Sequence, residues 1–398
     1  MVRRARGEHM QLALVGVGQA GGKIVDAFLE YDDQRGSDVV TSATAINTAE
    51  SDLRGLERVP KEHRVLIGQS RVKGHGVGAD NRLAAEIAGK ESNRILGALD
   101  HVPAGRTDAF LVIGSLGGGT GSGAAPVIAR NLRRVYTEPV YGLGVLPGRG
   151  EGGIYSLNAA QSFRTFVDEV DNLLLFDNDA WRDTGEALSA SYDRINDEIA
   201  RRFGVLFTAG AVDDGDVVGE SIVDASEIIN TLSTGGVSTV GYAAETIEAD
   251  EKGGLLSRFR GEETVDTATA TNRITSAVRQ ATLGRLTLPC SVDSADRALV
   301  VVGGPPEQLN RQGIERAREW VAEEAGTMEV RGGDYPLPGS EHVAGAVLLS
   351  NVTDVPRIEE LQQVAVETQD TIEATRSESE RDREKLVTDD GDEIDPLI

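Results

Sequence analysis

Segment 117–123 carries the residue types best suited to chemistry in this chain, with the sequence Gly-Gly-Gly-Thr-Gly-Ser-Gly. It lies between the apolar runs 108–114 and 124–130, an order typical of a strand, a turn and a helix. Glycines let backbone N–H groups turn toward an anion, and a helix N-terminus adds about half a positive charge. This second glycine loop therefore predicts a phosphate site, for which the candidates are Gly117, Gly118, Gly119, Thr120, Gly121 and Ser122. A tight turn without a ligand is the alternative.

A first glycine loop precedes it at 16–23, where Gly-x-Gly-x-x-Gly follows a predicted strand. Alone, this pattern suggests a dinucleotide site and an NAD-dependent oxidoreductase. The next strand ends in Asn47 and Thr48, however, without the acidic residue that would hold a ribose. Two phosphate loops in one sheet favour a nucleoside triphosphate. The candidates in this loop are Gly18, Gln19, Ala20, Gly21, Gly22 and Lys23.

Two acidic residues, Asp224 and Glu227, form the candidate catalytic pair. Residues three apart lie on the same face of a helical turn, and two carboxylates there can orient a water molecule. The same spacing also suits an aspartate that caps a helix with an acid three residues later. The residues alone leave both interpretations open.

The chain's alternation of apolar runs and amphipathic stretches predicts the elements that position these residues. We expect a doubly wound parallel α/β sheet, a long central helix and a second, smaller α+β domain. Strands are expected at 12–16, 39–46, 64–67, 110–113, 140–145, 172–176, 239–244, 299–302 and 344–349, and helices at 19–31, 80–99, 123–135, 153–168, 185–204, 268–282 and 309–325. The predicted boundaries are 1–9 for an extension, 10–184 for a nucleotide-binding domain, 185–221 for the central helix and linker, 222–352 for the second domain and 353–398 for a partly disordered acidic tail.

The composition restricts compartment and partners. The net charge is −25, and six of the 40 basic residues are lysine, which suggests adaptation to high salt. No basic stripe exists to neutralise phosphates, so nucleic acid is not an expected partner. No apolar run reaches about 18 residues, so we expect no transmembrane helix. The single cysteine, Cys290, excludes an internal disulfide and favours the cytoplasm.

The second glycine loop resembles the signature of the tubulin/FtsZ superfamily, and the resemblance extends over about 10–350. Loop 16–23 resembles the superfamily's first phosphate loop, with Gln19 and Ala20 closer to tubulin. Asn47 resembles the start of the second loop, and Gly78 and Asp80 lie in a segment similar to the third. Segment 147–152 resembles the ribose loop. It implies ribose contacts from Glu151 and, less directly, from Asn158; Tyr155 stands where FtsZ carries arginine.

The resemblance also implies a guanine site. Segment 177–179, Asp-Asn-Asp, is similar to tubulin's Asp-Asn-Glu at the base. Tyr192 and Asn196 match a Tyr-x-x-x-Asn pattern on tubulin's central helix and share one helical face. The ring is then expected to stack on the base, while the amides of Asn178 and Asn196 hydrogen-bond to its edges.

Segment 221–229 resembles the superfamily loop whose acids reach the γ-phosphate of the next subunit in a filament. The resemblance thus implies a GTPase of head-to-tail filaments that uses GTP/GDP and Mg²⁺, with the metal held mainly through the nucleotide. The mixture of FtsZ-like and tubulin-like motifs is most similar to the archaeal CetZ group, for which control of cell shape or motility is implied. A division-ring FtsZ and a binding-only regulatory paralogue are the alternatives. We expect cytoplasmic filaments near the envelope, with the acidic tail as a candidate contact for a membrane or envelope adaptor.

Overall fold

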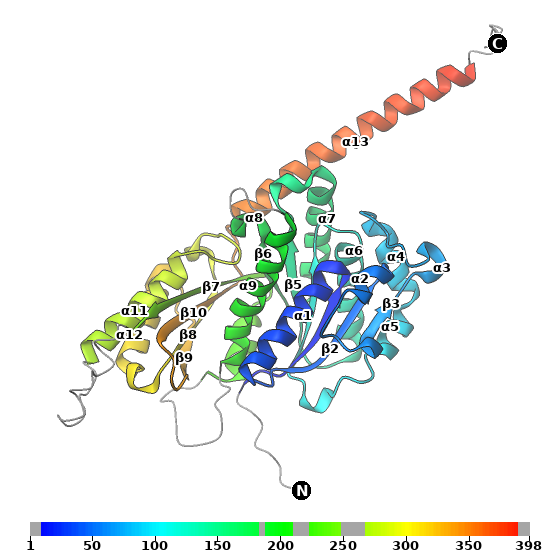
Figure 1. The fold of residues 1–398 in the computed structure, drawn as a ribbon. Coiled ribbons are helices and arrows are strands. Elements are labelled where there is room, and N and C mark those ends of the chain that lie inside the picture. The colour runs from blue at the N-terminus through cyan, green and yellow to red at the C-terminus, as the bar shows by residue number, and fades with distance from the viewer. Residues whose placement is uncertain (1–8, 183–187, 210–222, 248–266, 389–398) are drawn as a thin grey trace.

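The computed structural model describes residues 9–182, 188–209, 223–247 and 267–388. Within these ranges one mixed sheet carries the fold, in the order β3-β2-β1-β4-β5-β6-β7-β10-β8-β9 (Figure 1). The strands are β1 (Leu12–Val17), β2 (Val40–Asn47), β3 (Arg64–Leu66), β4 (Ala109–Ser115), β5 (Val140–Leu146), β6 (Asn172–Asp177), β7 (Val237–Thr246), β8 (Arg297–Gly304), β9 (Val330–Pro336) and β10 (His342–Ser350). Only β10 among these runs antiparallel to its neighbours.

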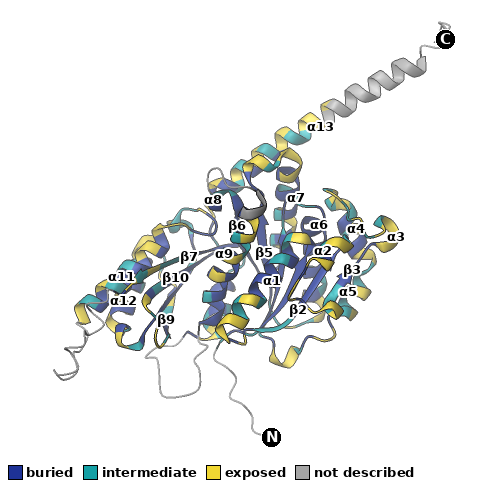
Figure 2. Cartoon of the chain, viewed as in Figure 1, coloured by how far each residue is buried: buried dark blue, intermediate teal, exposed yellow. Residues whose placement is uncertain are grey.

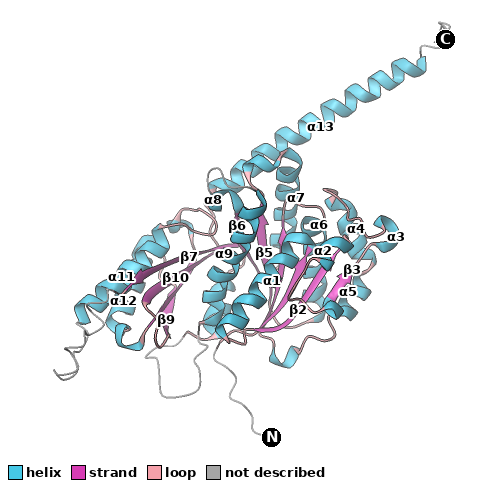
Figure 3. Cartoon of the chain, in the orientation of Figure 1, coloured by secondary structure: helices cyan, strands magenta, loops and turns pink. Residues whose placement is uncertain are grey.

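Helices cover both faces of the sheet (Figure 3). They are α1 (Gly18–Arg35), α2 (Glu50–Arg54), α3 (Gln69–Val72), α4 (Asn81–Lys90), α5 (Ser92–Ala98), α6 (Thr120–Val135), α7 (Gly153–Glu169), α8 (Asn178–Trp181), α9 (Leu188–Thr208), α10 (Ala225–Leu232), α11 (Thr267–Leu283), α12 (Arg311–Ala325) and α13 (Pro356–Thr388). Side chains of α1, α9 and α10 pack in one core, and those of α4, α6 and α7 in the other. The central strands are buried on both faces, as parallel strands between helices must be (Figure 2).

The sheet joins a first half, which holds β1 to β6, to the second α+β half through a short pairing of β6 with β7. Strands β6 and β7 are paired only at Leu173–Val237 and Leu174–Ser238. The buried Asn172 amide strengthens this junction by donating to the carbonyl oxygens of Leu232, at 3.2 Å, and Gly235, at 2.8 Å. The predicted fold class is confirmed.

Several predicted elements differ in their bounds. The helix expected at 80–99 is two helices, α4 and α5, which meet at Glu91. Strand β9 was not predicted: its sequence contains two glycines and ends in proline, so periodicity alone gives no strand signal. The acidic tail continues as helix α13 to Thr388, and its first turns pack against α7. The last part of the predicted tail, 389–398, lies outside the described residues.

Candidate functional site

The two glycine loops meet at the carboxyl ends of β1 and β4, which pair in parallel. Gly18 begins α1 with a φ of 75°, a conformation that favours glycine, and a Cβ there would lie 2.9 Å from the Gly121 nitrogen. The N-termini of α1 and α6 therefore point into one space. Two helix N-termini with free backbone N–H groups make this space suited to an anion such as a polyphosphate.

The third loop, 74–80, closes the other side of the second glycine loop. A Cβ on Gly119 would lie 2.0 Å from the Gly78 carbonyl oxygen, so the two backbones touch. The Asp80 carboxylate accepts a hydrogen bond from the Leu83 nitrogen at 2.9 Å and caps α4. The structure thus brings the glycine candidates and Asp80 together. The Asp80 carboxylate itself serves as the N-cap of α4.

Hydroxyl and amide groups fix the shape of the cradle from behind. The buried hydroxyls of Thr48 and Thr120 are 2.7 Å apart. The Asn47 side-chain oxygen accepts from the backbone nitrogens of Thr48, at 2.7 Å, and Ala49, at 3.2 Å. The Ser122 hydroxyl donates to the Gly118 carbonyl oxygen. Thr48 was not among the site candidates, although its place after Asn47 at a strand end could have indicated it.

Asn158 lies beneath these loops. Its amide nitrogen donates to the carbonyl oxygens of Ala79, at 2.8 Å, Gly117, at 3.1 Å, and Gly118, at 3.5 Å. The side chain therefore ties the third loop to the second glycine loop. Its contact with a ribose stays a prediction.

The remaining candidates of the first glycine loop have different environments. Gly21 and Gly22 are buried, Ala20 is half-buried and Gln19 is exposed. The Lys23 ammonium donates to the Gly55 carbonyl oxygen at 2.9 Å. Its charge is therefore engaged by the loop after α2, outside the two glycine loops.

The structure brings two of the base and ribose candidates into contact, Tyr192 and Glu151, and places Asn178 next to Asp179, which contacts the ribose loop. Tyr192, on α9, has its pKa raised by burial and by the carboxylate of Glu151, to which its hydroxyl is hydrogen-bonded. Asn196 lies one turn further along α9, half-buried. Asn178 begins α8, is 7% exposed and has a buried side-chain oxygen with no hydrogen-bond partner among the described residues. An unpaired buried acceptor is costly, and a ligand with N–H donors, such as guanine, would satisfy it.

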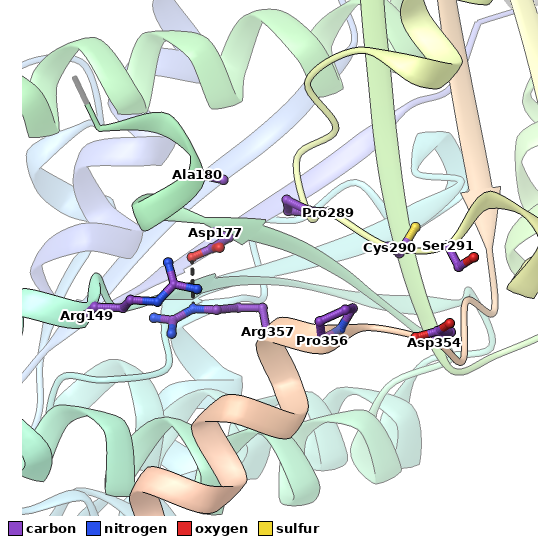
Figure 4. Close-up of a pocket in the computed structure, with 9 residues that line it drawn as sticks. All are labelled: Arg149, Asp177, Ala180, Pro289, Cys290, Ser291, Asp354, Pro356 and Arg357. Carbon is purple, nitrogen blue, oxygen red and sulfur yellow. Dashed lines mark hydrogen bonds and ion pairs between the residues drawn. The ribbon is translucent and has the colours of Figure 1, made fainter. Parts of the chain in front are cut away.

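Two arginines that we did not predict as site residues flank this region (Figure 4). Arg357, at the start of α13, contacts Asp177, and Arg149, in the ribose loop 147–152, contacts Asp179. Both arginines also contact Glu360. Burial raises the pKa of Asp177, and the Arg357 guanidinium partly opposes that shift. The contacts of Arg357 with Asp177 and of Arg149 with Glu360 span about half the chain, which is why no local pattern revealed them.

The candidate catalytic pair lies at the opposite end of the sheet. Helix α10 is held at the amino end of β6 through Asn172, whereas the phosphate and base loops lie at the carboxyl ends of the strands. Asp224 caps α10 by accepting from the Glu227 nitrogen at 3.0 Å, which confirms the capping interpretation. The Glu227 carboxylate pairs with Arg331 of β9 at 2.9 Å. Asp224 is exposed, so it is accessible to another molecule.

Comparison with known proteins decides the family. Residues 11–186 match the model of the tubulin/FtsZ family GTPase domain, and residues 185–367 match that of the tubulin-like CetZ C-terminal domain. CetZ1 of Haloferax volcanii is 64% identical over 373 residues, which cover 92% of this chain and 94% of CetZ1. This chain belongs to the CetZ family.

Solved structures agree with the CetZ assignment. A GDP-bound monomer of CetZ1 from Haloferax volcanii superposes with a TM-score of 0.80, 61% identity and coverage of 90% of this chain and 100% of that one. A GTPγS-bound protofilament of CetZ2 from the same organism gives a TM-score of 0.81, 42% identity and coverage of 92% and 100%. FtsZ of M. jannaschii, at 20% identity, shares the fold. The predicted resemblance is confirmed, and the dehydrogenase interpretation of the first glycine loop is wrong.

Membership in the CetZ family places a GTPase domain on the half of the chain that carries both glycine loops. Within the described ranges, none of the helices combines the length and apolarity needed to cross a membrane. The same ranges hold no cluster of three or more histidine, cysteine or acidic side chains arranged for a metal ion.

Proposed function

We propose that this CetZ-family chain binds GTP in the cradle formed by loops 16–23, 74–80 and 117–123 and hydrolyses it between subunits of a head-to-tail filament. The observation that carries the proposal is the separation of the two half-sites. Helix α9, 21 residues long, begins beside Glu151 and ends beside Tyr31, near the end of α1. At about 1.5 Å per residue, the helix spans about 30 Å. Neither end of α9 alone has both the N–H groups that would bind phosphate and the acidic pair, Asp224 and Glu227.

In this mechanism each residue has a limited task. Backbone N–H groups of the glycine loops and the Thr120 hydroxyl bind phosphate oxygens. Asn178, Tyr192 and Asn196 hold the base, and Glu151 the ribose. Asp224 and Glu227 of the adjoining subunit orient water toward the γ-phosphate. The GDP-bound CetZ1 and the GTPγS-bound CetZ2 protofilament support nucleotide binding by this chain.

Mg²⁺ fits the site only when it binds together with the nucleotide. Around the two glycine loops the described residues offer hydroxyls and backbone groups but no acidic cluster. Phosphates and water would supply most of its ligands, and the Thr120 hydroxyl would be the side-chain contribution of the loop. When bound, the ion neutralises phosphate charge.

The deciding experiment measures GTP hydrolysis against protein concentration, in molar KCl with Mg²⁺, together with light scattering. Specific activity that rises above a critical concentration, with scattering, is expected, because the catalytic site forms only between subunits. Turnover proportional to concentration without scattering would contradict the filament site. Nucleotide-dependent scattering without turnover would instead indicate a binding-only paralogue.

For the cellular role we propose control of cell shape or motility by filaments near the envelope. The identity of 64% to CetZ1 against 20% to an FtsZ structure supports this over the division ring. A tagged copy in living cells is expected along the envelope. A ring at midcell would contradict the proposal.

A further inference from the structure

The first turn of α13 reaches back into the nucleotide half of the molecule. The Arg357 side chain is 5% exposed and donates to the Pro147 carbonyl oxygen at 2.7 Å. It also contacts an Asp177 carboxylate oxygen at 3.4 Å. Pro147 begins the ribose loop and Asp177 begins the base loop, 177–179. One buried guanidinium therefore joins the two loops.

Glu360, one turn further along α13, completes the connection. Its carboxylate accepts from Arg357 Nη1 at 2.9 Å and from Arg149 at 2.7 and 2.6 Å. The Arg149 backbone nitrogen donates to Asp179 at 3.0 Å, and its guanidinium also contacts that carboxylate. Fork-shaped arginine–carboxylate pairs fix direction as well as distance. The ribose loop, the base loop and α13 thus share one hydrogen-bonded unit.

The unit adjoins the residues assigned to the nucleotide. Arg149 lies two positions before Glu151, and Asp177 directly precedes Asn178. A buried charge is costly unless it is paired. The first turn of α13 is therefore expected to keep a fixed position against the two loops. We propose that Arg357 and Glu360 are positioning residues that hold the ribose and base loops in their nucleotide-binding geometry, so that docking of α13 and nucleotide binding are coupled. The inference rests on the proposed binding of GTP.

A cavity beside the unit provides an independent reporter. It has a volume of about 610 Å³ and is lined by Arg149, Asp177 and Arg357 together with Cys290 (Figure 4). Cys290 is the single cysteine of the sequence. Cys290 is half-buried, and burial raises the pKa of its thiol to about 12. Pro356 and Arg357, in the first turn of α13, line the same cavity. We expect release of this turn to open the cavity, expose the thiol further and speed its reaction.

The test compares Glu360→Gln with Glu359→Gln in the full chain. Both remove one negative charge from adjacent positions of α13, but Glu359 is exposed and outside the unit. The rate of GDP dissociation is measured with a fluorescent GDP analogue in molar KCl. We expect Glu360→Gln to release GDP about tenfold faster, and Glu359→Gln at the wild-type rate. Arg357→Lys keeps the positive charge but loses the planar guanidinium that contacts several partners at once. It should release GDP at about the rate of Glu360→Gln.

Labelling of Cys290 by a maleimide distinguishes coupling between α13 docking and nucleotide binding from a general loss of stability. Because linkage is reciprocal, GDP should slow labelling of the wild-type protein and slow it less in Glu360→Gln. Unchanged GDP release in Glu360→Gln overturns the inference, and so does wild-type labelling that is indifferent to GDP. Wild-type protein that binds no GDP would instead remove the proposed function. If Arg357→Lys fails to fold, Glu360→Gln decides alone, because that side chain is 34% exposed.

Discussion

Asn178 is the residue with the clearest mark of a missing partner. Its side-chain oxygen is buried and unpaired among the described residues, although it begins a short helix beside the buried Asp177. Leaving such an acceptor unpaired costs about 1–3 kcal/mol. This cost is tolerated where a ligand later supplies the donor, so the residue connects stability to binding.

Replacement of Asn178 by leucine should therefore separate these two properties. GTP affinity should fall about 10- to 100-fold, because the amide contact is lost. The urea midpoint of the nucleotide-free protein should stay the same or rise, because an unpaired buried polar atom is removed. Isothermal titration and denaturation by urea measure the two quantities. A midpoint that drops in step with affinity would mean that Asn178 is structural.

Among the elements, the contact between the third loop and the second glycine loop leaves no room for a side chain. A Cβ on Gly119 would meet the Gly78 carbonyl oxygen at 2.0 Å, whereas nothing lies within 4 Å of one on Gly118. Gly119→Ala should therefore push the loops apart and weaken GTP binding by about 100-fold or more, while Gly118→Ala should change it about threefold or less. Fluorescent nucleotide titration compares the two. Equal losses would contradict the steric argument.

Acid should weaken the attachment of α13 to the ribose loop. Hydrogen bonds from Arg149, with further attraction from Arg357, lower the pKa of Glu360 below its ordinary value of 4.5. Its stabilising effect is therefore complete above that ordinary value and is lost as the pH falls through the lowered one. Asp177, with a raised pKa, acts in the opposite sense, because its ionised form is disfavoured in the fold.

The corresponding measurement is the urea midpoint of the wild-type protein and of Glu360→Gln between pH 7 and pH 3. The wild-type advantage should be constant from neutral pH down to about pH 5 and shrink below it, since protonated glutamate resembles glutamine. The same advantage persisting at pH 3 would exclude the ionised carboxylate as its source.

The glycine loops and most central strands could be predicted because their signals are local: a run of buried apolar residues followed by glycines. Asn178, Tyr192 and Glu151 required a resemblance, since a tyrosine and an asparagine carry no local sign of a base. Arg357 was beyond prediction, because its partners Pro147 and Asp177 lie about 200 residues away along the chain. Helix α13 begins inside the predicted acidic tail, and packing of its first turns on α7, a contact between segments far apart in the sequence, supports the helix there.

For the whole molecule, separation of the acids from the nucleotide loops predicts complementation between two defective proteins. Asp224→Asn keeps a cap for α10 but removes the carboxylate, whereas Asn178→Leu keeps the carboxylate but binds nucleotide poorly. A mixture should hydrolyse GTP faster than the sum of the two proteins alone, because each supplies the half-site that the other lacks. The readout is phosphate release at constant total protein.

The matched control replaces the second protein by the double variant Asn178→Leu with Asp224→Asn. This mixture should show no gain, since neither subunit offers the carboxylate. Gain in the control, or none in the test mixture, would place the catalytic acid elsewhere.

Helix α13 has a mechanical consequence. It is 33 residues long, which corresponds to a rod of about 50 Å, and its far end projects from the body of the molecule (Figure 1). A rod fixed at its base acts as a lever, and here the base is the buried guanidinium between the ribose and base loops. Tension on the far end would be delivered as torque to the ribose and base loops, which we propose hold the nucleotide. In the proposed filament, rods of this kind would let each subunit respond to load separately.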